Sequence, residues 1–298
     1  VVTYALIGTF VSAQDLQANR CFLYHLIGNG SGQWRVPQGG MGALVIELNR
    51  VAISHGVEIN LNSRVTGIES DQIGVAVTTS SGQKYVAKDL LFAGAPQTLA
   101  KLRGIPAPES LEGSQMKINI LLKRLPQLKS GIDPRLAFAG TFHANETFSQ
   151  FESVFADAQA GVMPAKMPIE MYCHTLSDPS ILSKELQAAG YQTLTLFGLH
   201  TPAELFDANN EATKATALAG FIAELDKYLV DPISEIIARN SDGSPCIEAK
   251  TPLDLEDAIS LPRGNIFHKD LTFPFREDGD SRRWGVETDD PRIFICGA

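Results

Sequence analysis

The order of apolar and polar positions divides the first third of the chain into a helix followed by strands. Apolar residues recur every three or four positions over 41–54, which predicts a helix with one buried stripe and a stop at Gly56. Alternating segments then follow, separated by turns at 71–72 and 81–82, as is typical of a β-meander. The continuously apolar run "LLFAGA" at 90–95 predicts a buried strand.

A different pattern begins after residues 103–112, where proline, glycine and charge predict a crossing between domains. Beyond this stretch, apolar segments of strand length and longer periodic segments indicate an α+β region. The strands are expected at 116–125, 169–176 and 191–200, and the helices at 145–160 and 210–229.

The final segment "RIFICGA" predicts another buried strand that stops on small residues, as "LLFAGA" does. We therefore expect the two strands to lie in one parallel sheet whose carboxyl ends face a ligand. A loop and a helix normally follow such a strand, and the chain begins with Val1 rather than methionine. The sequence thus predicts a fragment of a longer protein.

Composition narrows the class of protein. With 298 residues, of which 44% are hydrophobic, the chain can bury a large core, and no apolar run reaches the roughly 20 residues of a membrane span. The formal net charge of −9, with no basic block, argues against a nucleic-acid partner. The cysteines are far apart, without disulfide or zinc spacing, which predicts no metal site and favours the cytoplasm or another reducing intracellular compartment over secretion. They are Cys21, Cys173, Cys246 and Cys296.

The stretch "GQWRVPQGGMGAL" at 32–44 is the first candidate for chemistry. Glycines before a helix often bind phosphate, yet the stretch spells neither a P-loop nor GxGxxG. Three roles stay open on spacing alone: a nucleotide loop, a substrate loop and a structural turn. The turn is favoured because glycine adopts positive φ without steric cost.

The polar residues show no standard catalytic constellation, since neither a GxSxG elbow nor an HExxH helix is present. His268 alone among the scattered histidines follows a glycine-rich turn, and a loop or capping role competes with a role in a site. His25 is predicted to lie in a packed helix. Asp254, Glu256 and Asp257 indicate the first turn of a helix after a proline more than an acidic pair.

Taken in order, six segments resemble the phytoene desaturase-like flavoproteins within the wider flavin amine oxidase superfamily. They are "GQWRVPQGGMGAL", "HGVEINLNSRVTGIES", "LLFAGAPQTLAKL", "MKINILLKRLP", "LPRGNIFH" and "RIFICGA". The resemblance implies an α/β plus α+β fold, with a partial Rossmann-like FAD-binding domain and a mixed-sheet substrate domain. It assigns residues 1–31 and 104–250 to the substrate domain, and 32–103 and 251–298 to the FAD domain.

The same resemblance implies the site residues. Val65 takes the place where the backbone of these flavoproteins contacts the adenine of FAD. Asn265 and His268 are the candidates for polar groups near the substrate, and no other catalytic residue is implied. The residues implied to bind FAD are Gly39, Gly40, Met41, Val65, Ala93, Gly94, Ala95, Pro96, Gly297 and Ala298.

The reaction implied is hydride transfer from a C–H bond of a largely apolar small molecule to the flavin. The N-terminal GxGxxG segment of the family is absent from this sequence, so we expect the chain alone to bind FAD weakly or not at all, and to be inactive. Two alternatives stay open: a non-catalytic binding or regulatory module derived from the same fold, and peripheral contact with a membrane surface. Disulfide chemistry is not expected without a CxxC pair.

Overall fold

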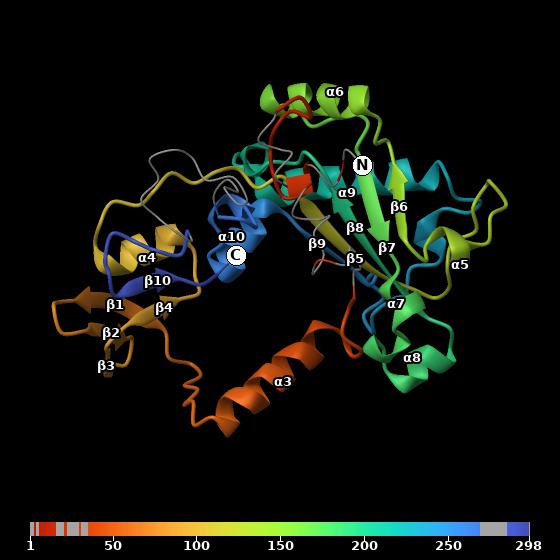
Figure 1. Cartoon of the computed structure of the whole chain (residues 1–298). Helices are drawn as coiled ribbons and strands as arrows, with labels where there is room; N and C mark the ends of the chain where they lie inside the picture. Colours follow the sequence, from red (N-terminus) through yellow and green to blue (C-terminus); the bar gives the residue numbers. More distant parts are fainter. Residues whose placement is uncertain are drawn as a thin grey trace.

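The computed structural model describes residues 3, 6–15, 21–22, 30, 35–268 and 285–297. The described chain has a larger part, built on a five-stranded sheet, and a smaller part with one three-stranded and one two-stranded sheet. Figure 1 shows the two parts on either side of the molecule, with helix α3 (Gly40–Ser54) extending below them.

The larger sheet is antiparallel throughout, in the order β6-β7-β8-β5-β9. The long helix α9 (Asn210–Asp226) covers one of its faces. The strands are β5 (Met116–Leu122), β6 (Thr141–Ala144), β7 (Ile169–Tyr172), β8 (Gln192–Gly198) and β9 (Ile247–Lys250).

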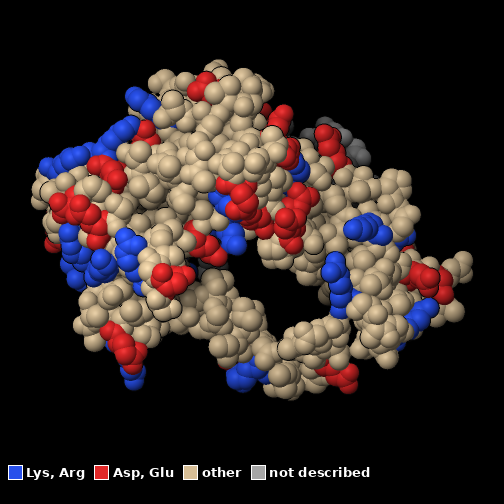
Figure 2. Space-filling view, turned by 180° about the vertical axis from the view of Figure 1, so that it is seen from behind, with Lys and Arg blue, Asp and Glu red and all other residues tan. Residues whose placement is uncertain are grey.

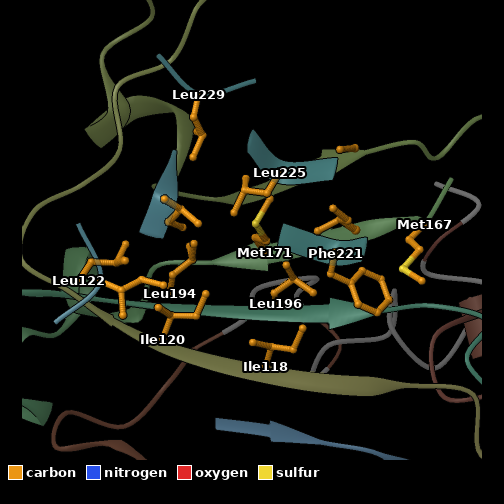
Figure 3. Packing of buried hydrophobic residues seen from close by; sticks show 14 of the residues in the cluster. Ile118, Ile120, Leu122, Met167, Met171, Leu194, Leu196, Phe221, Leu225 and Leu229 are labelled. Atoms are coloured by element: carbon orange, nitrogen blue, oxygen red, sulfur yellow. The ribbon is translucent and has the colours of Figure 1, made fainter. Parts of the chain in front are cut away.

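The core of this part lies between the sheet and α9. Ile118 and Ile120 of β5 point into it together with Leu194 and Leu196 of β8, and Phe221 of α9 packs over them (Figure 3). Each strand contributes every second residue, because side chains alternate between the two faces of a sheet. Burial of these side chains is the main source of stability in this part of the chain.

The smaller part contains the predicted β-meander, formed by β1 (Val65–Ser70), β2 (Val75–Thr79) and β3 (Lys84–Ala87). Beside it, β4 (Leu90–Phe92) pairs in parallel with β10 (Ile293–Ile295). Helix α4 (Pro96–Arg103) packs on β1. This core is small and contains Ile68, Val75, Leu99 and Ile293.

Helix α3 begins one residue before the predicted helix and ends where predicted. The expectation that its apolar stripe is buried is wrong for the described chain, since no residue of α3 is buried and Met41 and Val45 are 65% and 62% exposed. Periodicity predicts that a helix has an apolar stripe, but it does not determine whether another part of the chain packs against that stripe. Seen from behind, the space-filling view shows an opening between the two parts of the molecule, with α3 along its lower rim (Figure 2).

Several predicted elements have different ends in the structure. The strand predicted over 169–176 ends at Tyr172, because the chain turns there into α7 (His174–Ser177). The helix predicted over 210–229 ends at Asp226, whose carboxylate accepts a hydrogen bond from Ile233 N at 2.8 Å. The strands predicted over 116–125 and 191–200 are β5 and β8, and the helix predicted over 145–160 is α6 (Phe148–Gln159).

The remaining described helices are short. α10 begins with a capping box between Thr251 and Asp254, so the acidic residues there lie in a helix as predicted. Although the sequence assigns α10 to the FAD-domain segment, it packs against β9 of the larger part. His25 lies outside the described residues. The remaining short helices are α5 (Pro134–Ala137), α8 (Lys184–Ala188) and α10 (Pro252–Ile259). The 3-10 turns are η2 (Pro179–Ile181), η3 (Ala203–Phe206), η4 (Ile233–Glu235) and η5 (Pro262–Gly264).

Candidate functional site

The carboxyl ends of β4 and β10 lie side by side, although about two hundred residues separate the strands in sequence. Cys296 N donates to Phe92 O at 2.9 Å, which continues the pairing beyond the strands. A Cβ on Gly297 would lie 3.2 Å from Ala93 O, so the missing side chain permits this close approach. The predicted parallel pairing of the two strands is therefore confirmed. Ala298 lies outside the described residues.

A sharp turn follows β4 and leads directly into α4. Ala95 is the N-cap residue of this helix and Pro96 its first residue, which suits the fixed φ of proline. Gly94 lies under the ring of Phe92, where a Cβ would come within 2.7 Å of ring carbons. Strand, turn and helix N-terminus follow one another here, as they do at dinucleotide sites in parallel sheets.

Val65, the residue implied to contact adenine, starts the meander. It lines a shallow pocket of about 380 Å³ on the meander, together with Val77, Tyr85 and Leu90. The register between β1 and β2 shifts just after Val65, so its backbone lies next to a bulge. Because Leu90 belongs to β4, this pocket extends to the same strand whose far end carries the turn described above.

The glycine turn before α3 has left-handed backbone at both of its paired glycines, with φ of 87° at Gly39 and 73° at Gly40. Gly39 N donates to the carboxylate of Asp178 at 2.6 Å, and hydrogen bonds from the Ser180 side chain and from Gly39 hold the pKa of that carboxyl below its ordinary value. A side-chain anion thus occupies the N-terminus of α3. Met41 follows on the exposed stripe of the helix.

Asn265 and His268 share one turn after η5. Asn265 is buried, and its side-chain oxygen accepts from Phe267 N at 2.9 Å while its backbone oxygen accepts from His268 N at 3.1 Å. Burial lowers the pKa of His268, and its Nδ1 has no hydrogen-bond partner. This turn packs on Gly113, which lies in the segment that connects α4 to β5. The two residues therefore lie where the smaller part of the chain joins the larger.

Arg263 is the residue that fixes this turn, and sequence reasoning missed it. Its guanidinium donates to Glu112 at 2.7 Å and to both carboxylate oxygens of Asp207 at 2.7 and 2.8 Å. These partners raise the pKa of Arg263 and lower that of Asp207. The backbone of Arg263 adopts a left-handed φ of 52°, which is uncommon for a non-glycine residue. Three segments distant in sequence meet at this one side chain, so no local signal marks it.

Replacing Arg263 with alanine is expected to lower the free energy of unfolding by about 1–3 kcal/mol, because three charge-assisted hydrogen bonds are lost. The expected loss is smaller than the loss from breaking a fully buried ion pair, because Asp207 is half exposed. Arg263→Gly should cost less than Arg263→Ala, since glycine relieves the left-handed φ. Urea denaturation measures both. Arg124→Ala, which removes an exposed pair with Asp231, is the matched control; an equal loss in Arg124→Ala would contradict the bracing role.

Comparison with known proteins supports the class that these strand ends suggest. Residues 8–119 match the family of flavin containing amine oxidoreductases. The class of protein that this chain is similar to is therefore the flavin-dependent oxidoreductases, as the ordered motifs predicted. An oxidoreductase of Methanosarcina mazei has the same fold, with a TM-score of 0.60 and 11% identity over 99% of this chain and 58% of that protein.

Two particular relatives define the similarity further. An uncharacterized protein of Mycobacterium tuberculosis is 41% identical over all of this chain and 58% of its own length. Pyridine nucleotide-disulfide oxidoreductase domain-containing protein 2 of Mus musculus is 27% identical over 90% of this chain and 48% of its own length. The chain thus spans about half the length of these curated relatives. Within the described ranges no disulfide joins the cysteines, and no helix there is long and apolar enough to cross a membrane.

Proposed function

We propose that the intact protein is an FAD-dependent oxidoreductase that removes a hydride from a C–H bond of a largely apolar substrate. The observation that carries this proposal is the parallel pairing of β4 with β10, which brings the turn at Ala93 and the chain at Gly297 together. Ligands of α/β sheets bind at such carboxyl ends. The similarity to flavin containing amine oxidoreductases supports flavin as the ligand.

The residues at these strand ends fit a dinucleotide. Gly94 and Gly297 have no side chain, and Ala93 and Ala95 have small ones, so a ligand can approach the backbone closely. Val65 would hold the adenine end beside the pocket on the meander. FAD, when bound, supplies the acceptor for a hydride.

Much of this FAD site is proposed to come from outside the 298 residues. The chain contains no GxGxxG loop and spans 58% of its mycobacterial relative. Two apolar surfaces lack cover in the described chain: the stripe of α3, and the face of the two-stranded sheet where Leu91 is 68% exposed. Parallel sheets are normally covered on both faces, so further strands and helices would bury these surfaces.

The chain's own polar groups have a positioning role in this proposal. Burial lowers the pKa of His268, which favours the neutral ring, and a neutral imidazole can donate or accept a hydrogen bond with a substrate without adding charge. Asn265 holds the same turn in place, and Arg263 braces it. Because hydride transfer needs no paired acid and base from the protein, the lack of such a pair in the sequence agrees with this chemistry.

Flavin content tests the proposal. After gel filtration with excess FAD, we expect the 298-residue chain to retain far less than one flavin per chain, and the full-length mycobacterial relative to retain about one. Absorbance of the flavin measures both. A colourless full-length relative would contradict the FAD assignment, whereas a stoichiometrically yellow 298-residue chain would contradict only the incompleteness of its site. Binding of a protein partner without any flavin requirement would favour a non-catalytic module instead.

A further inference from the structure

A cluster of three potential metal ligands lies at the edge of the larger sheet, apart from the residues implied to bind FAD. His143 of β6 and Glu170 of β7 are direct cross-strand partners, so their side chains share one face. Glu146 follows three residues after His143, and its Oε2 lies 2.6 Å from His143 Nδ1. One ligand atom from each of the three residues lies within 4.8 Å of the other two.

Glu170 is completely buried, with 0% exposure, and among the described residues neither of its carboxylate oxygens has a hydrogen-bond partner. Oε1 of Glu146 is also buried without a partner. An unpaired buried carboxylate is strongly destabilising unless it is protonated or meets a cation.

In the described part of the chain, the ion pair to these two carboxylates comes from His143, through Glu146. Among the residues that the structure describes, no lysine or arginine pairs with Glu146 or Glu170. The other cross-strand partner of Glu170 is Phe197, an apolar ring. Thr3 donates a hydrogen bond to Glu146 and covers it, which adds one neutral donor but no charge.

We propose that His143, Glu146 and Glu170 form a binding site for a divalent transition-metal cation of the Zn²⁺ type. One imidazole and two carboxylates are a donor set that such ions accept, with a fourth position left for water. Two ligands bonded to one Zn²⁺ lie at most about 4.2 Å apart at bond lengths of about 2.1 Å. His143 Nδ1 and Glu146 Oε2 already lie within this limit, at 2.6 Å, and the ligand atoms of all three residues lie within 4.8 Å of one another, so side-chain rotations can complete the site.

His143 borders a cavity of about 510 Å³ that is also lined by Thr141, Phe142 and Tyr228, whereas Glu146 and Glu170 do not line it. The His143 side chain is 32% exposed, whereas Glu170 has no exposure. The ion therefore meets the imidazole first and then neutralises the buried carboxylates.

The zinc content of the purified chain tests this proposal directly. The purified chain is stripped with EDTA and dialysed against Zn²⁺, and the bound metal is determined by elemental analysis. We expect about one tightly held Zn²⁺ per chain, and at least about tenfold weaker retention in Glu170→Gln and in His143→Gln. Zinc should also raise the Tm of the wild type and leave the Tm of Glu170→Gln unchanged. A ligand that binds the folded chain and not the unfolded chain stabilises the fold, and the variant lacks the site.

The matched controls replace the same residue types at exposed positions, as Glu109→Gln and His55→Gln. Both should hold zinc as the wild type does. If Glu170→Gln does not fold, as far-ultraviolet circular dichroism reports, His143→Gln carries the test. Equal zinc retention by the wild type and by His143→Gln, or no retention by the wild type, overturns the proposal.

Discussion

Replacing Phe221 with alanine is expected to lower the free energy of unfolding by about 3–5 kcal/mol, a large share of the stability of an ordinary domain. The ring is completely buried between α9 and the larger sheet, where Leu194 and Leu196 belong to the same cluster (Figure 3). Truncation removes most of its apolar surface and leaves a cavity that rigid strands cannot fill. Chemical denaturation measures the loss.

Gly198, at the end of β8, makes the position of Phe221 possible. A Cβ on Gly198 would lie 1.9 Å from the Phe221 ring, a distance that no packed pair of carbons adopts. Gly198→Ala should therefore cost about 1–3 kcal/mol by overpacking. The same change in a chain that already carries Phe221→Ala should cost much less, because the added methyl group enters the cavity.

Gly140→Ala is the control for this pair, since nothing lies within 4 Å of a Cβ at that glycine. Its effect on stability should be within about 0.5 kcal/mol of zero. Additive losses in the double variant would show that the ring and the glycine do not share one packing site.

The second large effect is a dependence of stability on pH that comes from His200. The imidazole is 1% exposed, with neither ring nitrogen hydrogen-bonded. The rings of Phe10, Phe151 and Phe155 surround it at 5.7–5.9 Å. Burial lowers its pKa from 6.5 to about 4, while the Glu152 charge opposes this shift.

The sign of the effect follows from these two pKa values. In the unfolded chain His200 binds a proton below about pH 6.5, whereas in the folded chain it does so only below about pH 4. The stability that the neutral His200 contributes is therefore lost as the pH falls from 6.5 to about 4. The full loss is about 3 kcal/mol. Relative to His200→Phe, the wild type should therefore lose about 2–3 kcal/mol between pH 7 and pH 4.5.

The comparison with His200→Phe isolates this one group, because all other titrating groups are the same in the two chains. Denaturation curves at several pH values give the difference. His55→Gln, at an exposed histidine, should follow the wild type at every pH. The same pH dependence in the wild type and in His200→Phe would show that the pKa of His200 is the same in the folded and the unfolded chain.

The strand ends proposed to bind the cofactor were the more predictable part of the candidate site. Small residues after apolar runs identified both strand ends at Ala93 and Gly297, and the order of motifs identified the class of protein. The roles of Val65, Asn265 and His268 stay predictions, since their assignment came from resemblance. Arg263 could not have been predicted, because its partners Glu112 and Asp207 are far from it in the sequence and no local pattern indicates the contact.

The proposed metal ligands were missed for a similar reason. Two local signals of this cluster are present in the sequence. His143 and Glu146 are three residues apart, and Glu170 interrupts the otherwise apolar strand "IEMY". Short β6 was not predicted, because four residues form a strand only when β7 supplies hydrogen-bond partners. Without that pairing, the sequence does not indicate that His143 faces Glu170.

By itself, the sequence determined the elements whose own pattern is long enough to specify them: helix α3, the meander, β5, β8 and α9. These depend on periodicity and on turn residues, which are local properties of the chain. Only the tertiary structure decided which faces are buried, as the exposed stripe of α3 and the caged His200 show. Burial and charge pairing depend on residues that meet through folding across large sequence separations, and a linear pattern does not record which residues those are.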